Sequence, residues 1–427
     1  MLSCKCAYRL GGRNRVFVIG LVIFLLDSRG VCIGALHRLR QHLRLSGTIG
    51  GIQGELAAVK LSRSLLTIFR GHSRATAGFE RRRPFHHLPV DEFNGALSAE
   101  SGGAWRCRFI RCKGGPSGAC YAELEHSADG SPIPQEEAAD ILRQVARRCA
   151  LLHGIYEILA EGGDVASAAA LGASQAAAEY AKCRRGGWSL RFLACGTARP
   201  LTREEQLARI EPAEAAICAA LPPEERKGGG QSGGSLPLLA VHVPESSTAW
   251  LLRRLSSGGA VGGAADFVPP EAEPPRVARG GFLAQYALSK RPWRGRTDMC
   301  PEVAFIAANL ASVRVNDSVW DPCAGACGLL IAAAALGAQV GGSDVDLEAV
   351  NAAGANFAAL GLPAPALALH HGSVLDEATW PAALVRRRPL DAVLCDPPYG
   401  MKAAVCAAGV SSTVDAVARL AARRLRP

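Results

Sequence analysis

The sequence lacks any apolar run long enough to cross a membrane as a helix. Its longest such run, Val16 to Leu26, has eleven residues and is interrupted by Gly20, whereas a spanning helix needs about 20. The fifteen cysteines never fall into a CxxC pair, so no metal site of that kind is predicted. Collagen-like and coiled-coil compositions are absent as well. These absences argue against an integral membrane protein, a zinc knuckle and a fibrous protein.

What the chain does contain is enough apolar material for sizeable cores. It has 427 residues, of which 49% are hydrophobic and 20% charged. A length of this order accommodates two or three domains, and this hydrophobic fraction excludes a chain that is disordered throughout.

Acidic residues are scarce at the N-terminus. Residues 1–90 hold 15 Lys and Arg against three acids, whereas the remaining 337 residues hold 33 against 35. The net charge of +10 therefore comes from the first 90 residues, and it is weak evidence that the folded domains bind nucleic acid. An Arg-rich, acid-poor segment suits an organelle transit peptide, and an unstructured extension explains it equally well. We expect residues 1–90 to be a basic leader.

The residue composition and the pattern of apolar residues change after residue 90 and again near residue 280. Residues 91–256 combine strand and helix patterns, including a helix opened by a capping box at Thr202 and Glu205. Residues 257–280 are rich in Gly and Pro, which is typical of a linker. We therefore predict an α+β region at 91–256, a linker at 257–280 and a further domain at 281–427.

Strand and helix patterns alternate in residues 281–427. Predicted strands end at Trp320, Gly342, His371 and Cys395, and helical segments lie between them. Such alternation is typical of an α/β fold with a Rossmann-like, doubly wound parallel sheet.

A glycine-containing turn follows the first of these strands. Asp321 follows the strand, and Gly325 and Gly328 lie in the turn after it, so the backbone there can approach a nucleotide-like ligand closely. Asp344 ends the second strand, where a carboxylate can accept hydrogen bonds from ribose hydroxyls. The turn is neither GxGxxG nor a P-loop, so dinucleotide and nucleoside-triphosphate sites of those kinds are not predicted.

The strongest motif is Asp396-Pro397-Pro398-Tyr399, at the end of the fourth strand. Two prolines cannot continue a central strand and hold the backbone in an extended bend. There, the Asp396 carboxylate and the Pro397 carbonyl can accept both hydrogens of an exocyclic amine, while Tyr399 stacks on the planar base. Positioning and charge stabilisation would then carry the rate more than proton abstraction.

Together these motifs resemble the class I S-adenosylmethionine-dependent amino-methyltransferases. More narrowly, the sequence is similar to the catalytic subunits of eukaryotic tRNA (guanine-10, N2)-methyltransferases. The similarity is carried by IYEILAEG (155–162), LTREEQLARIE (201–211), LSKRPWRGRTDM (288–299), DPCAGACGLLIAAAALGAQVGGSDVD (321–346) and DPPYG (396–400).

The resemblance implies a site and its ligands. The cofactor would be S-adenosyl-L-methionine and the substrate a tRNA, bound by a THUMP module within 91–256. Thr297 would enclose the methionine part, Asp321, Gly325 and Gly328 would form the turn beside it, and Asp344 would hold the ribose, with Asp346 as the next choice. Residues Asp396 to Tyr399 would hold the guanine amine. A cytoplasmic location and a small zinc-binding activator subunit are also implied.

Three departures leave alternatives open. Cys323 and Ala326 replace an aromatic and a hydroxyl residue of the usual turn, and Ser373 stands near the place where an Asp is usual, with Asp376 three residues on. The chain also ends 27 residues after Gly400, so we expect an incomplete sheet with an open edge at the fourth strand. The alternatives are a catalytically impaired RNA-binding remnant and an adenine-N6 methyltransferase.

Overall fold

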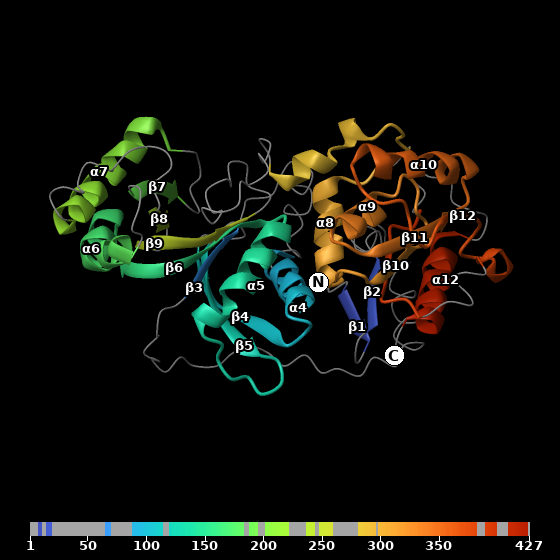
Figure 1. Ribbon diagram of the computed structural model, residues 1–427, viewed down its shortest axis with the longest axis horizontal. Helices are drawn as coiled ribbons and strands as arrows, with labels where there is room; N and C mark the ends of the chain where they lie inside the picture. Colours follow the sequence, from blue (N-terminus) through green and yellow to red (C-terminus); the bar gives the residue numbers. More distant parts are fainter. Residues whose placement is uncertain are drawn as a thin grey trace.

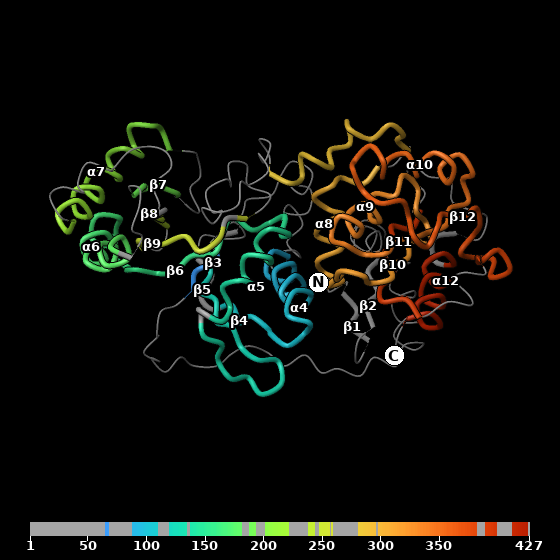
Figure 2. The backbone as a smooth tube through the Cα atoms, viewed as in Figure 1, coloured from blue at the N-terminus to red at the C-terminus, as the bar shows by residue number. Residues whose placement is uncertain are grey.

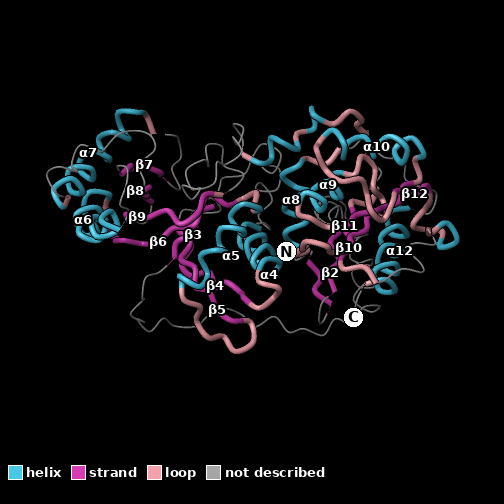
Figure 3. Tube along the Cα trace, in the orientation of Figure 1, coloured by secondary structure: helices cyan, strands magenta, loops and turns pink. Residues whose placement is uncertain are grey.

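The described residues form two α/β parts, each built on one sheet (Figures 1 and 3). Among the helices that are described, none combines the length and apolarity that a bilayer requires. The computed structural model describes residues 7–10, 14–18, 65–69, 88–113, 119–182, 188–194, 201–221, 236–243, 247–258, 281–295, 298–381, 389–398 and 409–425.

The C-terminal part is built on a six-stranded sheet with a parallel centre. Four strands run in the order β12-β11-β10-β13, and each neighbouring pair is parallel. Because the order reverses at β10, the crossovers lead to opposite sides of it, which is the doubly wound arrangement. This confirms the predicted Rossmann-like fold. The strands are β10 (Ser318–Asp321), β11 (Gln339–Asp344), β12 (Leu369–His371) and β13 (Ala392–Cys395).

Successive residues of the central strands enter different cores. Val319 and Leu394 pack in the cluster that contains the residues of α8, α9 and α10. Trp320 and Val393 pack instead with residues of α12, which lies on the opposite side of the sheet from α10 (Figure 2). This period of two is the pattern of strands buried on both faces. The elements are η4 (Phe282–Tyr286), η5 (Leu288–Lys290), α8 (Pro301–Leu310), α9 (Gly328–Ala335), α10 (Leu347–Ala359), η6 (Glu377–Thr379) and α12 (Gly409–Arg424).

The edge of β13 is paired, which corrects the expectation of an open edge. Strand β2 (Asn14–Val18) runs parallel to β13, with Arg15 opposite Ala392 and Val18 opposite Cys395. Strand β1 (Ala7–Leu10) continues the sheet antiparallel to β2. A buried strand needs partners for its outer N–H and C=O groups, and a short stretch that includes two valines has the β-propensity to supply them.

The N-terminal part is built on a seven-stranded sheet in the order β4-β5-β3-β6-β9-β8-β7. Its first half has the chain order β-α-β-β-α-β with antiparallel neighbours, which is a ferredoxin-like unit. The helices of this unit pack on one face, where Phe93 and Leu142 join Leu65. The unit consists of β3 (Leu65–Phe69), α4 (Leu88–Glu100), β4 (Trp105–Lys113), β5 (Ala119–His126), α5 (Gln135–Arg148) and β6 (Leu152–Gly162).

The position of β3 differs from the predicted domain boundary at residue 91. This strand lies between β5 and β6 in the middle of the sheet, and Leu65, Leu66 and Thr67 are buried. Helix α4 begins at Leu88, also before the boundary. Residues within the basic segment therefore contribute to the fold. The sequence did not reveal this, because a five-residue strand is too short to stand out from its Arg-rich surroundings.

The second half of the seven-stranded sheet shares β6 with the first half. β9 pairs with β6 along almost its full length, and β7 and β8 are parallel to each other. The capping box predicted at Thr202 and Glu205 opens α7, with both reciprocal hydrogen bonds present. These elements are α6 (Val165–Lys182), β7 (Trp188–Ala194), α7 (Arg203–Ala220), β8 (Leu236–Val243) and β9 (Thr248–Ser257).

A buried polar network, which we call the α4–α8 joint, connects the two parts. It consists of Glu92, Arg148 and Asn309. Both carboxylate oxygens of Glu92 accept backbone N–H groups, from residues 150 and 151, at 2.7 and 2.9 Å. Asn309 donates to Glu92 and to the carbonyl of Arg148, both at 2.9 Å, and accepts from Arg148 Nε at 2.8 Å. Burial of a charged group is tolerated when it is hydrogen-bonded in this way.

The two helices of the joint touch at a glycine. A Cβ added to Gly95 on α4 would lie 2.1 Å from the carbonyl oxygen of Asn309. Any side chain at this position would force α4 and α8 apart and break the α4–α8 joint.

We expect Leu66→Ala to lower the free energy of unfolding of the full chain by about 2–5 kcal/mol, the usual cost of a cavity in a core. Leu66 is completely buried. The matched control is Leu171→Ala on α6, where the leucine is 70% exposed and the change should stay within about 0.5 kcal/mol. Chemical denaturation measures both. A neutral Leu66→Ala would show that the segment before residue 91 is a leader with no part in the fold.

Candidate functional site

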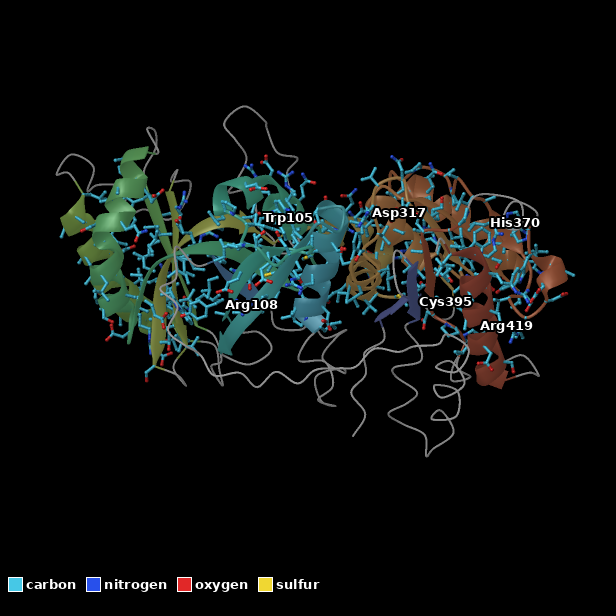
Figure 4. All side chains as sticks on the ribbon, turned by 90° about the horizontal axis from the view of Figure 1, so that it is seen from below. Trp105, Arg108, Asp317, His370, Cys395 and Arg419 are labelled. Carbon is cyan, nitrogen blue, oxygen red and sulfur yellow. The ribbon has the colours of Figure 1, made fainter. Side chains whose placement is uncertain are left out.

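Three predicted site residues come together at the carboxyl edge of the six-stranded sheet. Asp321 ends β10, Asp344 ends β11, and Asp396 follows β13 directly. Because these strands are parallel, their carboxyl ends meet at one edge, outside which ligands bind in sheets of this kind. Figure 4 labels Cys395, the residue before Asp396 and the partner of Val18 on β2.

Asp321 is a buried carboxyl group. Asp321 is only 2% exposed, and its Oδ1 accepts the N–H of Cys323 at 2.9 Å. Burial raises the pKa of Asp321 well above its usual range, and the charges of Asp344 and Asp396 raise it further. Asp321 therefore shapes the turn that follows it, and ionisation of its own carboxyl group is unfavourable.

The turn between β10 and α9 has an unusual backbone. Gly325 has a φ of +48°, and nothing would meet a Cβ there within 4 Å. Cys327 has a φ of +63°, which is uncommon for a residue with a side chain. Gly328 opens α9, and a Cβ on it would lie 3.1 Å from the Cβ of Met299. The open space at Gly325 and the close packing at Gly328 fit the predicted role of this turn beside a ligand.

Asp344 and Asp346 have different tasks. Asp344 Oδ2 accepts the N–H of Gly325 at 2.7 Å, and its Oδ1 accepts the N–H of Asp346 at 2.9 Å. Asp346 is the N-cap of α10, where its carboxylate accepts from the backbone of residues 348 and 349. A carboxylate has about four acceptor positions, so Asp344 retains acceptors for ribose hydroxyls, whereas Asp346 stabilises a helix. This geometry favours Asp344 over Asp346 as the ribose ligand.

Asp396 has a buried oxygen that lacks a partner among the described residues. That atom is Oδ1, and the residue as a whole is half-buried. Burial raises the pKa of Asp396 to about 6. Pro397 is buried and Pro398 half-buried, which fixes the strand exit. An unsatisfied buried acceptor is uncommon and indicates a missing donor. Tyr399 and Thr297, predicted to stack on the base and to enclose the cofactor, lie outside the described residues.

Two further residues near the turn were not singled out from the sequence. Asn356 on α10 is completely buried, donates to the carbonyl of Ala326 at 3.3 Å and accepts the N–H of Trp293 at 3.1 Å. It therefore holds the segment around residue 293 against the glycine turn. Arg291, in that same segment, is buried beside Gly328. Both Arg291 and Trp293 belong to the LSKRPWRGRTDM stretch, which was the available signal.

The arrangement suits a ligand with positive charge and hydrogen-bond donors. Three carboxyl groups lie at one edge, and one of them has a buried oxygen that lacks a described partner. The glycine turn leaves space next to Asp344. A nucleoside would bring hydroxyl donors, and an amine would bring N–H donors, to these acceptors.

Curated proteins similar to this chain are tRNA methyltransferases. It is 32% identical to "tRNA (guanine(10)-N(2))-methyltransferase" of Saccharomyces cerevisiae over 136 residues, covering 30% of each chain. It is 33% identical to "tRNA (guanine(10)-N(2))-methyltransferase TRMT11" of Homo sapiens over 138 residues, covering 28% of this chain and 29% of that one. The predicted resemblance is confirmed, and the chain spans less than a third of the length of these relatives.

Other comparisons add less. No family model matches the sequence. Among solved structures, TrmN from Thermus thermophilus is 17% identical with a TM-score of 0.39, covering 86% of each chain. A predicted N6-adenine-specific DNA methylase from Listeria monocytogenes is 11% identical with a TM-score of 0.41, covering 85% of this chain and 86% of that one. The fold of this chain follows from its own strand order and pairing.

We expect Asp321→Asn to raise the free energy of unfolding at pH 8 by about 1–3 kcal/mol, because an amide does not ionise when the chain unfolds, whereas burial and two carboxylates oppose ionisation of Asp321 in the folded chain. The gain should shrink toward pH 4, since a carboxyl whose pKa is raised in the folded state loses stability as pH rises. Asp346→Asn is the control, because Asn caps a helix as well as Asp does. Thermal unfolding across this pH range measures both, and destabilisation by Asp321→Asn at pH 8 would contradict the account.

Proposed function

We propose that this chain transfers a methyl group from S-adenosyl-L-methionine to the N2 amine of a guanine in tRNA, at position 10 by resemblance. The observation that carries the proposal is Asp396 Oδ1, a buried acceptor without a partner among the described residues, directly before two prolines. An exocyclic amine offers the N–H donor that this oxygen lacks. The names of the yeast and human relatives support guanine in tRNA as the substrate.

The residues present fit the cofactor. Asp344 has acceptors left for ribose hydroxyls, and the positive φ of Gly325 opens the backbone beside it. Asp321 fixes the turn by accepting the N–H of Cys323. When bound, the cofactor supplies an electrophilic methyl group on a positively charged sulfur. The carboxylates of this edge stabilise such a cation where neutral side chains would not.

The Asp396 carboxylate orients the attacking amine. By accepting amine hydrogens, it and the Pro397 carbonyl would aim the nitrogen toward the methyl group, and holding both reactants in line supplies much of the rate. As the nitrogen–methyl bond forms and the sulfur–methyl bond breaks, the amine must lose one proton. A carboxylate whose pKa is about 6 is mostly ionised at neutral pH and can take that proton.

A tRNA guanine has to leave its stack to reach this edge. We propose that the seven-stranded part is the RNA-binding, THUMP-like module that holds the tRNA while this happens. The α4–α8 joint, a buried network between the two parts, would hold such a module in a fixed position relative to Asp396. We also propose that a small zinc-binding subunit activates the chain, that it acts in the cytoplasm, and that organelle targeting by residues 1–90 is the alternative.

The experiment is methylation of an unmodified tRNA transcript by the full chain, with and without the activator subunit, using labelled S-adenosyl-L-methionine. Digestion to nucleosides identifies the product. N2-methylguanosine is expected, whereas N6-methyladenosine would assign the chain to adenine. Binding of tRNA without any labelling, even with the activator, would favour an RNA-binding remnant.

We expect Asp396→Ala to lower methyl transfer by at least about a hundredfold. The affinity for S-adenosyl-L-methionine should change little, because the carboxylate is assigned to the amine rather than to the cofactor. Asp376→Ala is the matched control, since this exposed carboxylate instead caps η6. Calorimetry and the labelling assay together distinguish the two effects. Full activity of Asp396→Ala would remove this residue from the mechanism.

The rate should also depend on pH through Asp396. With a raised pKa of about 6, kcat/KM of the wild-type chain should fall as pH decreases through 6, because the protonated carboxyl no longer accepts the amine hydrogens. Asp396→Asn cannot titrate, so its residual activity should lack this acidic limb. A wild-type profile that stays flat from pH 5 to 8 would contradict the proposed role.

A further inference from the structure

Arg291 is a buried cation without a hydrogen-bond partner among the described residues. The residue is 4% exposed, and its Nε, Nη1 and Nη2 all lack partners there. Burial lowers the pKa of its guanidinium, and the charge of Asp298, whose carboxylate accepts the N–H of Gly295, opposes that shift without a hydrogen bond to Arg291. Guanidinium groups stay charged in proteins, and an unpaired buried charge is far more costly than a paired one. This side chain therefore indicates an anion that belongs beside it.

The guanidinium lies at the start of α9. A Cβ placed on Gly328, the first residue of this helix, would be 3.6 Å from Arg291 Nη1. The N-cap residue, Cys327, makes no side-chain hydrogen bond to the helix. The first N–H groups of any helix lack partners within it and carry a partial positive charge. An uncapped helix start and a buried guanidinium thus face the same small region.

Several elements hold Arg291 in place. Its N–H donates to the carbonyl of Leu288 at 3.2 Å. Two residues further on, Trp293 is bound by Asn356, which also contacts the glycine turn through Ala326. The backbone after Arg291 is therefore connected to the glycine turn through Asn356.

The surroundings select among anions. Asp321 and Asp344 act on the neighbouring Cys327 as negative charges, and Arg291 acts on it as a positive one. A polyanion would be repelled by the carboxylates of this edge. An amino-acid group has one carboxylate for the guanidinium and one ammonium for the carboxylates, so it satisfies both sets of charges.

We propose that Arg291, together with the first N–H groups of α9, binds the carboxylate of the amino-acid part of the cofactor. This inference rests on the proposed function. It gives the buried guanidinium a ligand-binding role next to the first residue of α9.

The test is calorimetry on the full chain with two ligands that differ only in this carboxylate, S-adenosyl-L-methionine and its decarboxylated form. The wild-type chain should bind the complete ligand ten- to a hundredfold more tightly. Arg291→Met, which retains an apolar stem of similar length, should lose that factor for S-adenosyl-L-methionine and leave the decarboxylated ligand unchanged. Arg294→Met is the matched control, an exposed arginine in the same segment, and should alter neither affinity.

Other outcomes would overturn the inference. Equal affinity of the wild-type chain for both ligands would do so without any variant, and it would leave the proposed function standing. Equal weakening of both ligands by Arg291→Met would show a structural role, which Arg291→Lys would then rescue. Weaker tRNA binding with unchanged cofactor affinity would assign Arg291 to an RNA phosphate. A wild-type chain that binds neither ligand would instead refute the proposed function.

Discussion

Parallel pairing of β10 with β11 on one side and β13 on the other forces three strand ends, with their carboxyl groups, onto one edge of the sheet. The negative charges of Asp344 and Asp396 raise the pKa of Asp321, which burial has already raised. This edge is electrostatically unfavourable on its own, and its buried acceptor at Asp396 lacks a described donor. Such a concentration of like charge is expected where a cationic or donor-rich ligand compensates for it.

Arg291 and the carboxylates make the edge bipolar rather than uniformly acidic. The guanidinium lies at the start of α9, while the acids follow the strands around it. A ligand that carries an ammonium, a carboxylate and ribose hydroxyls can satisfy each group in turn. The segment that carries Arg291 is hydrogen-bonded to Asn356, and Asn356 is hydrogen-bonded to the glycine turn. This buried amide therefore holds the guanidinium segment and the turn next to the carboxylates together.

The α4–α8 joint extends this order to the other half of the molecule. Asn309 hydrogen-bonds to both Glu92 and Arg148 within a buried contact, and the absence of a side chain at Gly95 lets the helices approach. Buried polar groups of this kind penalise any other relative arrangement, since separating them would leave a charge unpaired. A large substrate held by one part would therefore present its target to the other at a constant distance.

The sequence by itself determined the Rossmann-like order of the C-terminal part and the places of Asp321, Asp344 and Asp396, because strand, turn and helix signals are local. It did not separate β3 from the basic segment around it, since a five-residue strand carries too little periodicity, and only its pairing with β5 and β6 places it inside the sheet. It ranked Asp344 before Asp346 as the ribose ligand, but it did not show that Asp346 is the N-cap of α10. Only the tertiary structure decided which buried groups lack described partners, namely Asp396 Oδ1 and the Arg291 guanidinium. The physical reason is that satisfaction of a polar group depends on atoms brought close by folding, and no local pattern records them.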